Sequence, residues 1–466
     1  MSLEFWGVMG YIALTLVVGF WASRGVETED DYLLAGRKIG PMLAIFTTFA
    51  TWFGAETCIG SAGSIYSDGL GGSTADPFGY ALCLVLMGAI FAVPLWRLHI
   101  TTLADLFRMR FGLSVERLVT LLVVPTSLMW GAAQIRAFGQ VLTTTSDMGL
   151  FWGTTIAAAV VIAYTVSGGL MADVVTDFVQ GIALIVGLVI LGGVVVYQFD
   201  GSVIDHLRQL PSERLALFGT AETPFFERIE MWAIPIFGSV LSQELVARVM
   251  AVRTPQIART STLIASGMYL LVGLIPVGIG LLGPALLPNL EHAEQLLPAV
   301  ARQSLPTILY VVFAGALVSA ILSTVDSALL VAASLTEHNL IVSFWPNLPD
   351  KSRVRIARTL VVIFGVLAYT MALYAEGVYA LVEEASAFGS SGVFVVATLG
   401  LFTRYGGIRA AWASLVSGIL VYLAGAYIFA FGAPYLLSLG AALLAYLLVG
   451  LTEGRFAGFA HRPSAA

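Results

Sequence analysis

The stretch 307–341 is apolar and long enough to cross a lipid bilayer, yet Asp326 lies near its middle. A carboxylate at the centre of a membrane-spanning helix costs about 3 kcal/mol or more, so it normally faces a partner, an ion or a water-filled cavity. Ser319, Ser323 and Ser327 share one helical stripe with Asp326, at the spacing i, i+4, i+7, i+8. Oxygen ligands without cysteine or histidine suit a hard cation such as Na+. The stretch therefore predicts an ion or proton site, although the hydroxyls alone are equally compatible with bonds to helix backbone.

The composition of the chain places it in a membrane. Of its 466 residues, 58% are hydrophobic and only 11% are charged, and the mean hydropathy is +0.90. No water-soluble domain buries so large a share of apolar side chains. The apolar runs are about 20 residues long, as a bilayer core of roughly 30 Å requires, and they lack the alternation of barrel strands. We therefore expect an all-α polytopic membrane protein, with the lipid bilayer as a partner.

Catalytic and nucleic-acid-binding classes find no support in the sequence. The two cysteines, Cys58 and Cys83, both lie in apolar runs, so no disulfide framework or metal cluster is indicated. Of the five histidines only His338 touches a predicted span, at its inner end, and no metal-ligand spacing or nucleophile motif accompanies it. We expect neither an enzyme nor a nucleic-acid partner.

Thirteen membrane-spanning helices can be drawn along the chain. They fall at 4–23, 40–66, 76–96, 116–146, 149–166, 170–198, 229–250, 257–289, 307–341, 354–375, 377–403, 406–432 and 434–452. An odd number of spans puts the two termini on opposite sides of the membrane. If the N-terminus is outside, few of the 23 Lys and Arg residues lie in the outer segments. Those that do are Arg208, Arg214, Arg228 and Arg302. Arg136 lies within a span and the remainder fall on the inner side. The positive-inside rule therefore predicts an outer N-terminus and a cytoplasmic C-terminus in the plasma (inner) membrane.

The second and the seventh predicted spans are interrupted. Gly54 and Glu56 lie in mid-membrane in the second span, and Pro235, Gly238 and Glu244 lie in the seventh. Gly and Pro free backbone carbonyls that can coordinate a cation, and the N-terminus of a half-helix can hold a carboxylate. Two breaks five spans apart favour a 5+5 inverted repeat, although glycine kinks are also common in ordinary membrane helices.

The breaks also indicate how the chain is divided. We expect an N-terminal extra helix and loop at 1–39, a ten-helix core at 40–403, and two C-terminal helices with a short tail at 404–466. The core would consist of a first repeat at 40–198 and a second repeat at 229–403. In such an arrangement the binding site lies at the membrane midplane, between the broken helices.

Two strings of residues resemble a known family. SGGLMADVVTDFVQG (167–181) resembles the signature of the sodium:solute symporter family, with its GGL, TD and Q, and SAILSTVDSALL (319–330) is similar to the family's ion-binding helix. The resemblance runs in order from about residue 5 to about residue 430. It implies a ten-helix inverted-repeat core of the amino-acid-transporter type with three flanking helices, and coupling of solute uptake to a Na+ gradient.

The resemblance also implies where cations would bind. A sodium site typical of the family would take the backbone carbonyls of Ala50, Phe53 and Ala320 and the hydroxyls of Ser323 and Thr324. A second cation or proton site, found in some members, would take Ser323, Asp177, Asp326 and Ser327. Two carboxylates near one site repel each other, so either a second Na+ bridges them or one carboxylate is protonated. The alternative for Asp177 is a structural pairing with a basic side chain.

For the solute, the closest local resemblance is to the choline transporters of this family. The segments ATWFGAET, DPFGYALCL and LMWGAAQIRAFG carry it, and they place Trp52, Tyr80 and Trp130 as walls of an aromatic cage. Such a cage attracts a quaternary or protonated amine by cation–π contacts of about 0.5–2 kcal/mol per ring. Two further cage tryptophans would fall at Ser242 and near Val382, so the cage is incomplete. Ordinary packing between helices is the alternative for each ring.

Polar side chains complete the predicted solute site. They are Glu56, Thr57, Gln134, Ser242 and Gln243, a lining that suits a smaller amine, an amino acid or another zwitterion as well as choline. Arg136 needs a carboxylate within the membrane. Either it forms an ion pair with Glu56, Glu244 or Glu383, which we favour, or it receives a solute anion. The sequence assigns no role to Glu244, Glu383 or Glu384.

We therefore expect a secondary active symporter, with Na+ as the coupling ion, that imports a small polar organic solute by alternating access. The solute would be an organic amine or cation, or a zwitterion such as an amino acid. A membrane solute sensor without net transport, and a symporter for a sugar or a carboxylate, are the alternatives. Because only a short tail follows the last predicted span, no attached signalling domain is expected, which disfavours the sensor.

Overall fold

The computed structural model describes residues 3–22, 35–146, 148–166, 170–199 and 202–453. Apart from an isolated parallel bridge between Ile39 and Val252, these residues form helices and connecting loops, which confirms the all-α fold class. Three parts of the sequence-based predictions lie outside the described residues: the loop 23–34, the first residues of the family-like string (167–169) and the tail 454–466.

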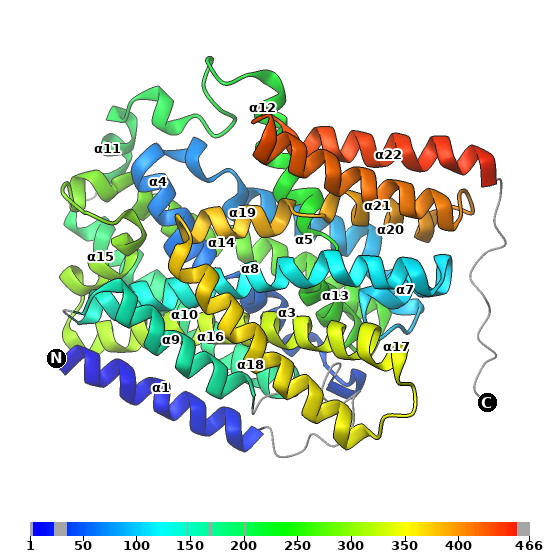
Figure 1. Cartoon of the computed structure of the whole chain (residues 1–466). Helices are drawn as coiled ribbons and strands as arrows, with labels where there is room; N and C mark the ends of the chain where they lie inside the picture. Colours follow the sequence, from blue (N-terminus) through cyan, green and yellow to red (C-terminus); the bar gives the residue numbers. More distant parts are fainter. Residues whose placement is uncertain (1–2, 23–34, 147, 167–169, 200–201, 454–466) are drawn as a thin grey trace.

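The first half of the chain carries the elements up to α10, where η marks a short π- or 3-10-helical segment (Figure 1). Their bounds are α1 (Leu3–Ala22), η2 (Ala35–Arg37), α3 (Pro41–Trp52), η3 (Glu56–Ser61), α4 (Ala62–Asp68), η4 (Leu70–Ser73), η5 (Ala75–Gly79), α5 (Tyr80–Leu86), η6 (Met87–Phe91), α6 (Ala92–Arg97), α7 (Leu103–Phe111), α8 (Leu113–Thr145), α9 (Leu150–Thr165) and α10 (Leu170–Gln198).

The second half begins with a polar segment and continues to the last helix. Its bounds are α11 (Val203–Gln209), η7 (Ser212–Leu215), α12 (Phe225–Ala233), η8 (Ile234–Gly238), α13 (Gln243–Met250), α14 (Pro255–Leu286), η9 (Ala293–Gln295), α15 (Leu296–Ser304), α16 (Thr307–Leu335), η10 (Thr336–Ile341), α17 (Val342–Phe344), α18 (Asp350–Tyr374), α19 (Val378–Ala387), α20 (Ser390–Phe402), α21 (Ile408–Leu423), η11 (Ala424–Ile428) and α22 (Pro434–Glu453).

The described residues contain 8 helical spans that are long and apolar enough to cross a membrane, or up to 11 if each bent pair of helices is one span. The helix α9 is apolar but shorter than these spans. The chain is thus a multi-pass membrane protein, and the number of thirteen spans stays a prediction. Among the 8 straight spans, the one that contains α16 has the largest buried share, so the helix with Asp326 lies at the centre of the protein.

Both predicted breaks are confirmed. The axis bends by 45° between α3 and the helix that starts at Glu56, and by 41° between the helix that ends at Gly238 and α13. A third break of 41° separates α19 from α20, where Gly389 adopts a left-handed backbone conformation (φ +67°) that glycine tolerates best. The sequence analysis did not single out this third break.

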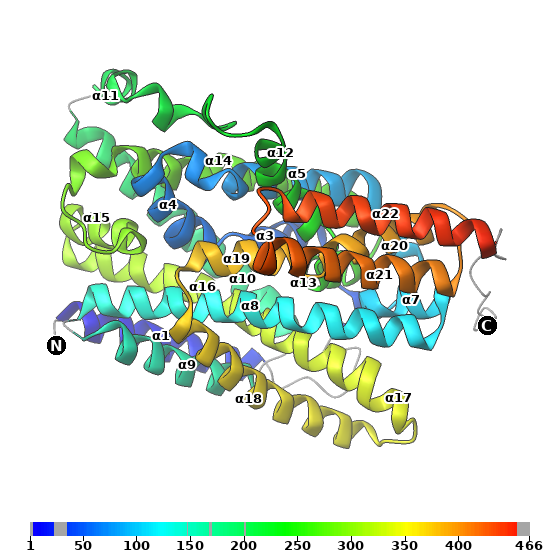
Figure 2. The same ribbon diagram turned by 45° about the horizontal axis from the view of Figure 1, so that its top comes forward.

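The broken helices lie inside a shell of longer helices. The helix α3 packs against α10, α14 and α16, and α8 runs along α16, α9, α18 and α19. Figures 1 and 2 show α21 and α22 as a pair on one flank of the protein and α1 on the opposite flank, beside α16. Each break therefore faces protein and not lipid, which is where irregular backbone is tolerated at membrane depth.

A short strap joins α3 to α13. The N–H of Ile39, just before α3, donates to the carbonyl of Ala251, just after α13, at 3.2 Å. The N–H of Arg253 donates back to the carbonyl of Ile39 at 3.2 Å, and its Nε donates to the carbonyl of Lys38 at 2.6 Å. The two half-helices that precede the first break and follow the second are thus tied together at one end.

Gly238 tests the contact between two of the breaks. A Cβ at this position would lie 2.1 Å from the backbone carbonyl oxygen of Ser386 on α19, which cannot move without moving the helix. We expect Gly238→Ala to destabilise the protein by about 1–3 kcal/mol and to lower its thermal unfolding midpoint in detergent. Gly278→Ala on α14 is the matched control, because nothing lies within 4 Å of the added Cβ. Equal midpoints for the two variants would contradict this packing.

Candidate ion and solute site at the helix breaks

The break after α3 faces α16. Phe53 has an extended backbone (φ −99°, ψ 93°), and the helix resumes at η3. The hydroxyl of Thr324 lies 3.4 Å from the carbonyl oxygen of Ala50 and 3.1 Å from that of Ala320. A Cβ on Gly54 would lie 3.2 Å from this hydroxyl, so glycine permits the close approach. Three residues of the predicted sodium site thus meet beside a fourth, Phe53.

Ser323, the fifth residue of that predicted site, turns toward a carboxylate. Its hydroxyl donates to Oδ1 of Asp177 on α10, and the hydroxyl of Thr47 on α3 donates to Oδ2 at 2.5 Å. Asp177 and Asp326 are both buried and lie close enough for their charges to repel. The predicted second cation position is therefore adjacent to the first, and it is built from α3, α10 and α16.

An arginine that the sequence analysis did not place here lies beside Asp177. Arg248 on α13 is only 2% exposed. Its Nη2 lies 3.8 Å from Oδ2 of Asp177 and donates to Oγ of Ser327 at 2.6 Å, and its Nε donates to the hydroxyl of Thr51 at 3.0 Å. Sequence patterning counts Arg248 only among the inner basic residues, because periodicity does not tell which helices face each other.

The three predicted cage rings lie together. The ring centroids of Trp52 and Tyr80 are 5.1 Å apart, those of Trp52 and Trp130 are 5.5 Å apart, and those of Tyr80 and Trp130 are 6.1 Å apart. The pairs are tilted or edge-on, which are favourable arrangements for aromatic rings. A small cavity lies between two of these rings, those of Trp52 and Trp130, and Thr324, and its other lining residues are Thr51, Ser242, Glu244 and Ala328.

Polar atoms without partners surround the same break. Nε2 of Gln134 donates to Oε2 of Glu56 at 2.8 Å, and both side chains are fully buried. Oε1 of Glu56, Oε1 of Gln134 and Nε1 of Trp52 have no hydrogen-bond partner among the described residues. The group therefore offers two acceptors and one donor. A buried polar atom left unpaired costs about 1–3 kcal/mol, so a ligand that pairs with these atoms would be stabilised.

Two predicted solute residues have other partners. The hydroxyl of Thr57 donates to the carboxylate of Asp76 at 2.9 and 3.0 Å and lies 3.0 Å from the hydroxyl of Tyr269. The Oε1 of Gln243 accepts from the backbone N–H of Leu103, where α7 begins. Asp76 was missed because it stands at the start of a predicted span, and its burial depends on a helix far away in the sequence.

Arg136 forms an ion pair, as favoured, but with a carboxylate outside the predicted set. Its Nε lies 3.4 Å from Oε2 of Glu294 in η9, and its guanidinium donates to the carbonyls of Ala372 and Glu376 at 3.3 Å. Glu294 also accepts from Nε2 of Gln140 at 2.7 Å and from the N–H of Val378, the first residue of α19. These contacts, which we name the outer clamp after the side on which the predicted orientation places them, hold η9 against α8 and α19.

Two of the carboxylates without a predicted role also bond hydroxyls. Oε1 of Glu244 accepts from Ser127 at 2.7 Å, and Oε2 of Glu384 accepts from the hydroxyl of Tyr422 at 2.9 Å. Glu244 therefore links α13 to α8, and Glu384 links α19 to α21.

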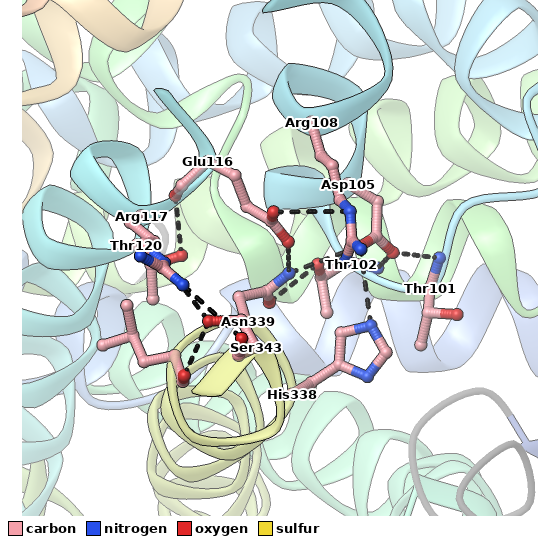
Figure 3. A network of polar contacts seen from close by, with 11 residues as sticks. Thr101, Thr102, Asp105, Arg108, Glu116, Arg117, Thr120, His338, Asn339 and Ser343 are labelled. Atoms are coloured by element: carbon pink, nitrogen blue, oxygen red, sulfur yellow. Dashed lines mark hydrogen bonds and ion pairs between the residues drawn. The ribbon is translucent and has the colours of Figure 1, made fainter. Parts of the chain in front are cut away.

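A second polar network lies just after the C-terminal end of α16 (Figure 3), and we name it the inner network after the side on which the predicted orientation places it. Asn339 in η10 donates to Oε1 of Glu116 at 2.8 Å and accepts from the hydroxyl of Thr102 at 3.0 Å. His338 lies 3.5 Å from Asp105 on α7. Burial alone raises the pKa of Asp105, but His338 and backbone N–H groups at the start of α7 hold this pKa below its ordinary value. The network joins α7 and α8 to the ion helix.

Comparison with known proteins identifies a family pattern over most of the chain. The model of the sodium:solute symporter family matches residues 32–451. The high affinity choline transporter 1 of Homo sapiens is 28% identical over 458 residues, covering 92% of this chain and 77% of the relative. The high-affinity choline transporter 1 of Drosophila melanogaster is 29% identical, and the match spans 62% of that relative's length. A sodium/pantothenate symporter of Haemophilus influenzae is 28% identical over 72% of each chain.

Solved structures share the fold. A Na+-coupled sialic acid symporter, in a substrate-bound outward-open state, superposes with a TM-score of 0.84 at 16% identity, over 99% of this chain and 100% of the other. Mhp1, a nucleobase-cation-symport-1 family transporter in a closed conformation, gives a TM-score of 0.62 at 17% identity, over 92% of this chain and 95% of the other. At these identities the likeness speaks for the fold alone.

Asn339 tests whether the inner network stabilises the fold. Asn339→Leu leaves Oε1 of Glu116 and the hydroxyl of Thr102 without the partners they have now. We expect a loss of about 1–3 kcal/mol, seen as a lower unfolding midpoint in detergent. Thr359→Val is the control, since that exposed hydroxyl bonds only the backbone of its own helix, at the carbonyl of Arg355. A midpoint no lower than that of the control would contradict a stabilising role.

Proposed function

Because the chain belongs to the sodium:solute symporter family, we propose that it uses a Na+ gradient to import a small organic solute that carries an ammonium group. Its relatives are secondary transporters, and the chain is a multi-pass secondary transporter and not an enzyme. Na+-coupled symport follows from the family. The position of the ion, the identity of the solute and the membrane orientation are the proposed parts.

We place the Na+ between the break after α3 and the helix α16. The approach of the Thr324 hydroxyl to the carbonyl of Ala50, at 3.4 Å across two helices, is the observation that carries this proposal. The carbonyls of Phe53 and Ala320 and the hydroxyl of Ser323 complete a set of five oxygens. Such neutral oxygens suit a hard monovalent cation. Bound there, the ion would hold the first broken helix against the ion helix.

The unpaired atoms beside the break indicate the chemistry of the solute. An ammonium group would donate to Oε1 of Glu56 and Oε1 of Gln134, which have no partner among the described residues. The rings of Trp52, Tyr80 and Trp130 would add cation–π attraction. An acceptor on the solute, such as a carboxylate or hydroxyl oxygen, would satisfy the indole N–H. We therefore favour an amino alcohol, an amino acid or a similar amine.

Coupling follows because both ligands use the same break. Gln134 stands between them, since its Oε1 would lie 3.6 Å from a Cβ on Gly54 while its Nε2 bonds Glu56. A ligand on either side favours the same arrangement of the broken helix, so each raises the affinity for the other. The outer clamp and the inner network would open in turn, which gives alternating access.

The proposed orientation has the N-terminus outside and the C-terminus in the cytoplasm of the plasma (inner) membrane, with most basic residues inside. The two repeats would be 40–198 and 229–403, between the helix at 1–39 and the pair of helices at 404–466. In this orientation the clamp at Glu294 faces outward and the network at Asn339 faces inward.

The family function is tested by uptake of radiolabelled amines, amino acids, sugars and carboxylates into proteoliposomes, with and without a Na+ gradient. Candidate solutes come from a thermal-shift screen, because a ligand that binds only the native state raises its apparent stability. Accumulation of an amine driven by Na+ supports the proposal. Binding without flux would favour a sensor, and flux of sugars alone would reject the ammonium assignment.

The ion position is tested by removing its hydroxyls. We expect Thr324→Ala and Ser323→Ala to raise the half-saturating Na+ concentration in uptake assays about tenfold or more, equivalent to about 1.4 kcal/mol of lost binding free energy. Ser261→Ala on α14 is the control, because its hydroxyl bonds only its own helix, at the carbonyl of Ile257. Unchanged Na+ dependence in both variants would remove the assignment.

The solute position is tested by neutralising its carboxylate. Glu56→Gln keeps the shape of the side chain and its neighbour Gln134 but removes the negative charge. We expect the half-saturating concentration of an amine solute to rise by about 10–100-fold, since hydrogen bonds to charged groups contribute about 1.5–3 kcal/mol. The control is Glu222→Gln, an exposed carboxylate. If the amine affinity in the Glu56 variant equals that of the control, Glu56 does not bind the solute.

A further inference from the structure

Two of the side chains predicted to hold a second cation, Asp177 and Ser327, lie beside a positive charge of the protein itself. The guanidinium of Arg248 donates to Ser327 at 2.6 Å and lies 3.8 Å from the carboxylate of Asp177. Its side chain is 1% exposed and that of Asp177 is 0% exposed, so water screens this contact little. The charge comes from α13, while the predicted ligands come from α10 and α16.

The oxygen atoms of Asp177 and Ser327 are already bonded within the protein. Oδ1 of Asp177 accepts from Ser323, and Oδ2 accepts from Thr47 at 2.5 Å. Oγ of Ser327 accepts from Nη2 of Arg248. Nε of Arg248 donates to Thr51, whose own hydroxyl donates to the carbonyl of Thr47 at 2.6 Å. A Na+ that bound these oxygens would have to displace the guanidinium or share a buried site with it.

The charge of Arg248 is permanent. A guanidinium is not deprotonated in proteins, unlike a lysine amine or a histidine ring, so this positive charge cannot be lost during a transport cycle. Two positive charges a few ångströms apart in a buried site repel strongly. A second Na+ or a proton could balance the two carboxylates, and a basic side chain was the alternative predicted for Asp177. The structure supports this alternative, because Arg248 is a cation that is covalently part of the chain.

We propose that the guanidinium of Arg248 takes the place of a second coupling ion, so that the protein moves a single Na+ with each solute. The proposal rests on the proposed function, which puts the first Na+ at Thr324. Ser323 is a predicted ligand of both cation positions, and its hydroxyl donates to Asp177. The fixed charge of Arg248 therefore orients the carboxylate of Asp177. That carboxylate in turn contacts the hydroxyl of Ser323, which belongs to the proposed site of the transported Na+.

The cavity that leads to Arg248 is consistent with this role. A cavity lined by Thr101 and Thr102 at one end and by Arg248 and Ser327 at the other extends from the inner network to the guanidinium. A cation that entered from the inner side would meet this positive charge before it reached Asp177. The second position is thus closed to Na+ by charge as well as by hydrogen bonds.

The test measures ion number in two independent ways. Binding of radioactive Na+ to the purified full-length protein gives the number of ions bound and the Hill coefficient, and the reversal potential of amine uptake in proteoliposomes gives the ions moved per solute. For the wild-type protein we expect one bound Na+, a Hill coefficient near one, and one Na+ per solute. Two ions by either measurement would overturn the proposal.

Variants of Arg248 separate its charge from its packing. Arg248→Met removes the charge at similar length, and we expect a second Na+ to bind, with a Hill coefficient that rises toward two. Arg248→Lys keeps a charge and should still bind one Na+. Arg259→Met, at an exposed position on α14, is the matched control and should behave as wild type.

Failure of this proposal is distinguishable from failure of the proposed function. A folded Arg248→Met protein that still binds one Na+ would overturn the present proposal alone. If that variant does not fold, the wild-type ion number decides by itself. Absence of any Na+ binding to the wild-type protein would overturn the proposed function and this proposal with it.

Discussion

Inside a bilayer no water is available to pair with a buried carboxylate, and Asp177 therefore depends on what other helices bring to it. Thr47 from α3, Ser323 from α16 and Arg248 from α13 supply hydroxyls and a positive charge. Removing one partner of a buried ion pair is strongly destabilising, by about 3–5 kcal/mol, because it leaves an uncompensated charge. Helices that are distant in the sequence are thus held in one arrangement, and the ion and solute residues take their positions from that arrangement.

The helix α8 connects the proposed solute site to the contacts around Glu294. It carries Trp130 beside the cage, Gln134 beside the break, and Arg136 and Gln140 in contact with Glu294. These residues follow one another along a single rigid element. A solute bound at the proposed cage would therefore contact the same helix that holds η9 in place. The proposed solute site and the contacts at Glu294 thus share one helix.

Sequence reasoning could point to residues whose signal is local to one helix. Gly54 interrupts a span, Ser323 stands on a polar stripe, and Thr324 and the three rings lie in family-like strings, so each has a signal in its own segment. It missed Arg248, Asp76 and Glu294, because their roles depend on which distant segments meet. Gln243 shows the same limit, since its place beside the second break suggested solute contact while its side chain holds the start of α7.

The strap between Ile39 and Ala251 has a mechanical consequence. Each of the two segments donates a backbone hydrogen bond of 3.2 Å to the other, which couples the start of α3 to the end of α13. The two half-helices are therefore expected to move together. A relative rotation of the two halves of either broken helix would then take place at the breaks next to Gly54 and Gly238. A movement of α3 that began at the proposed sodium position would in this way reach both interrupted helices at once.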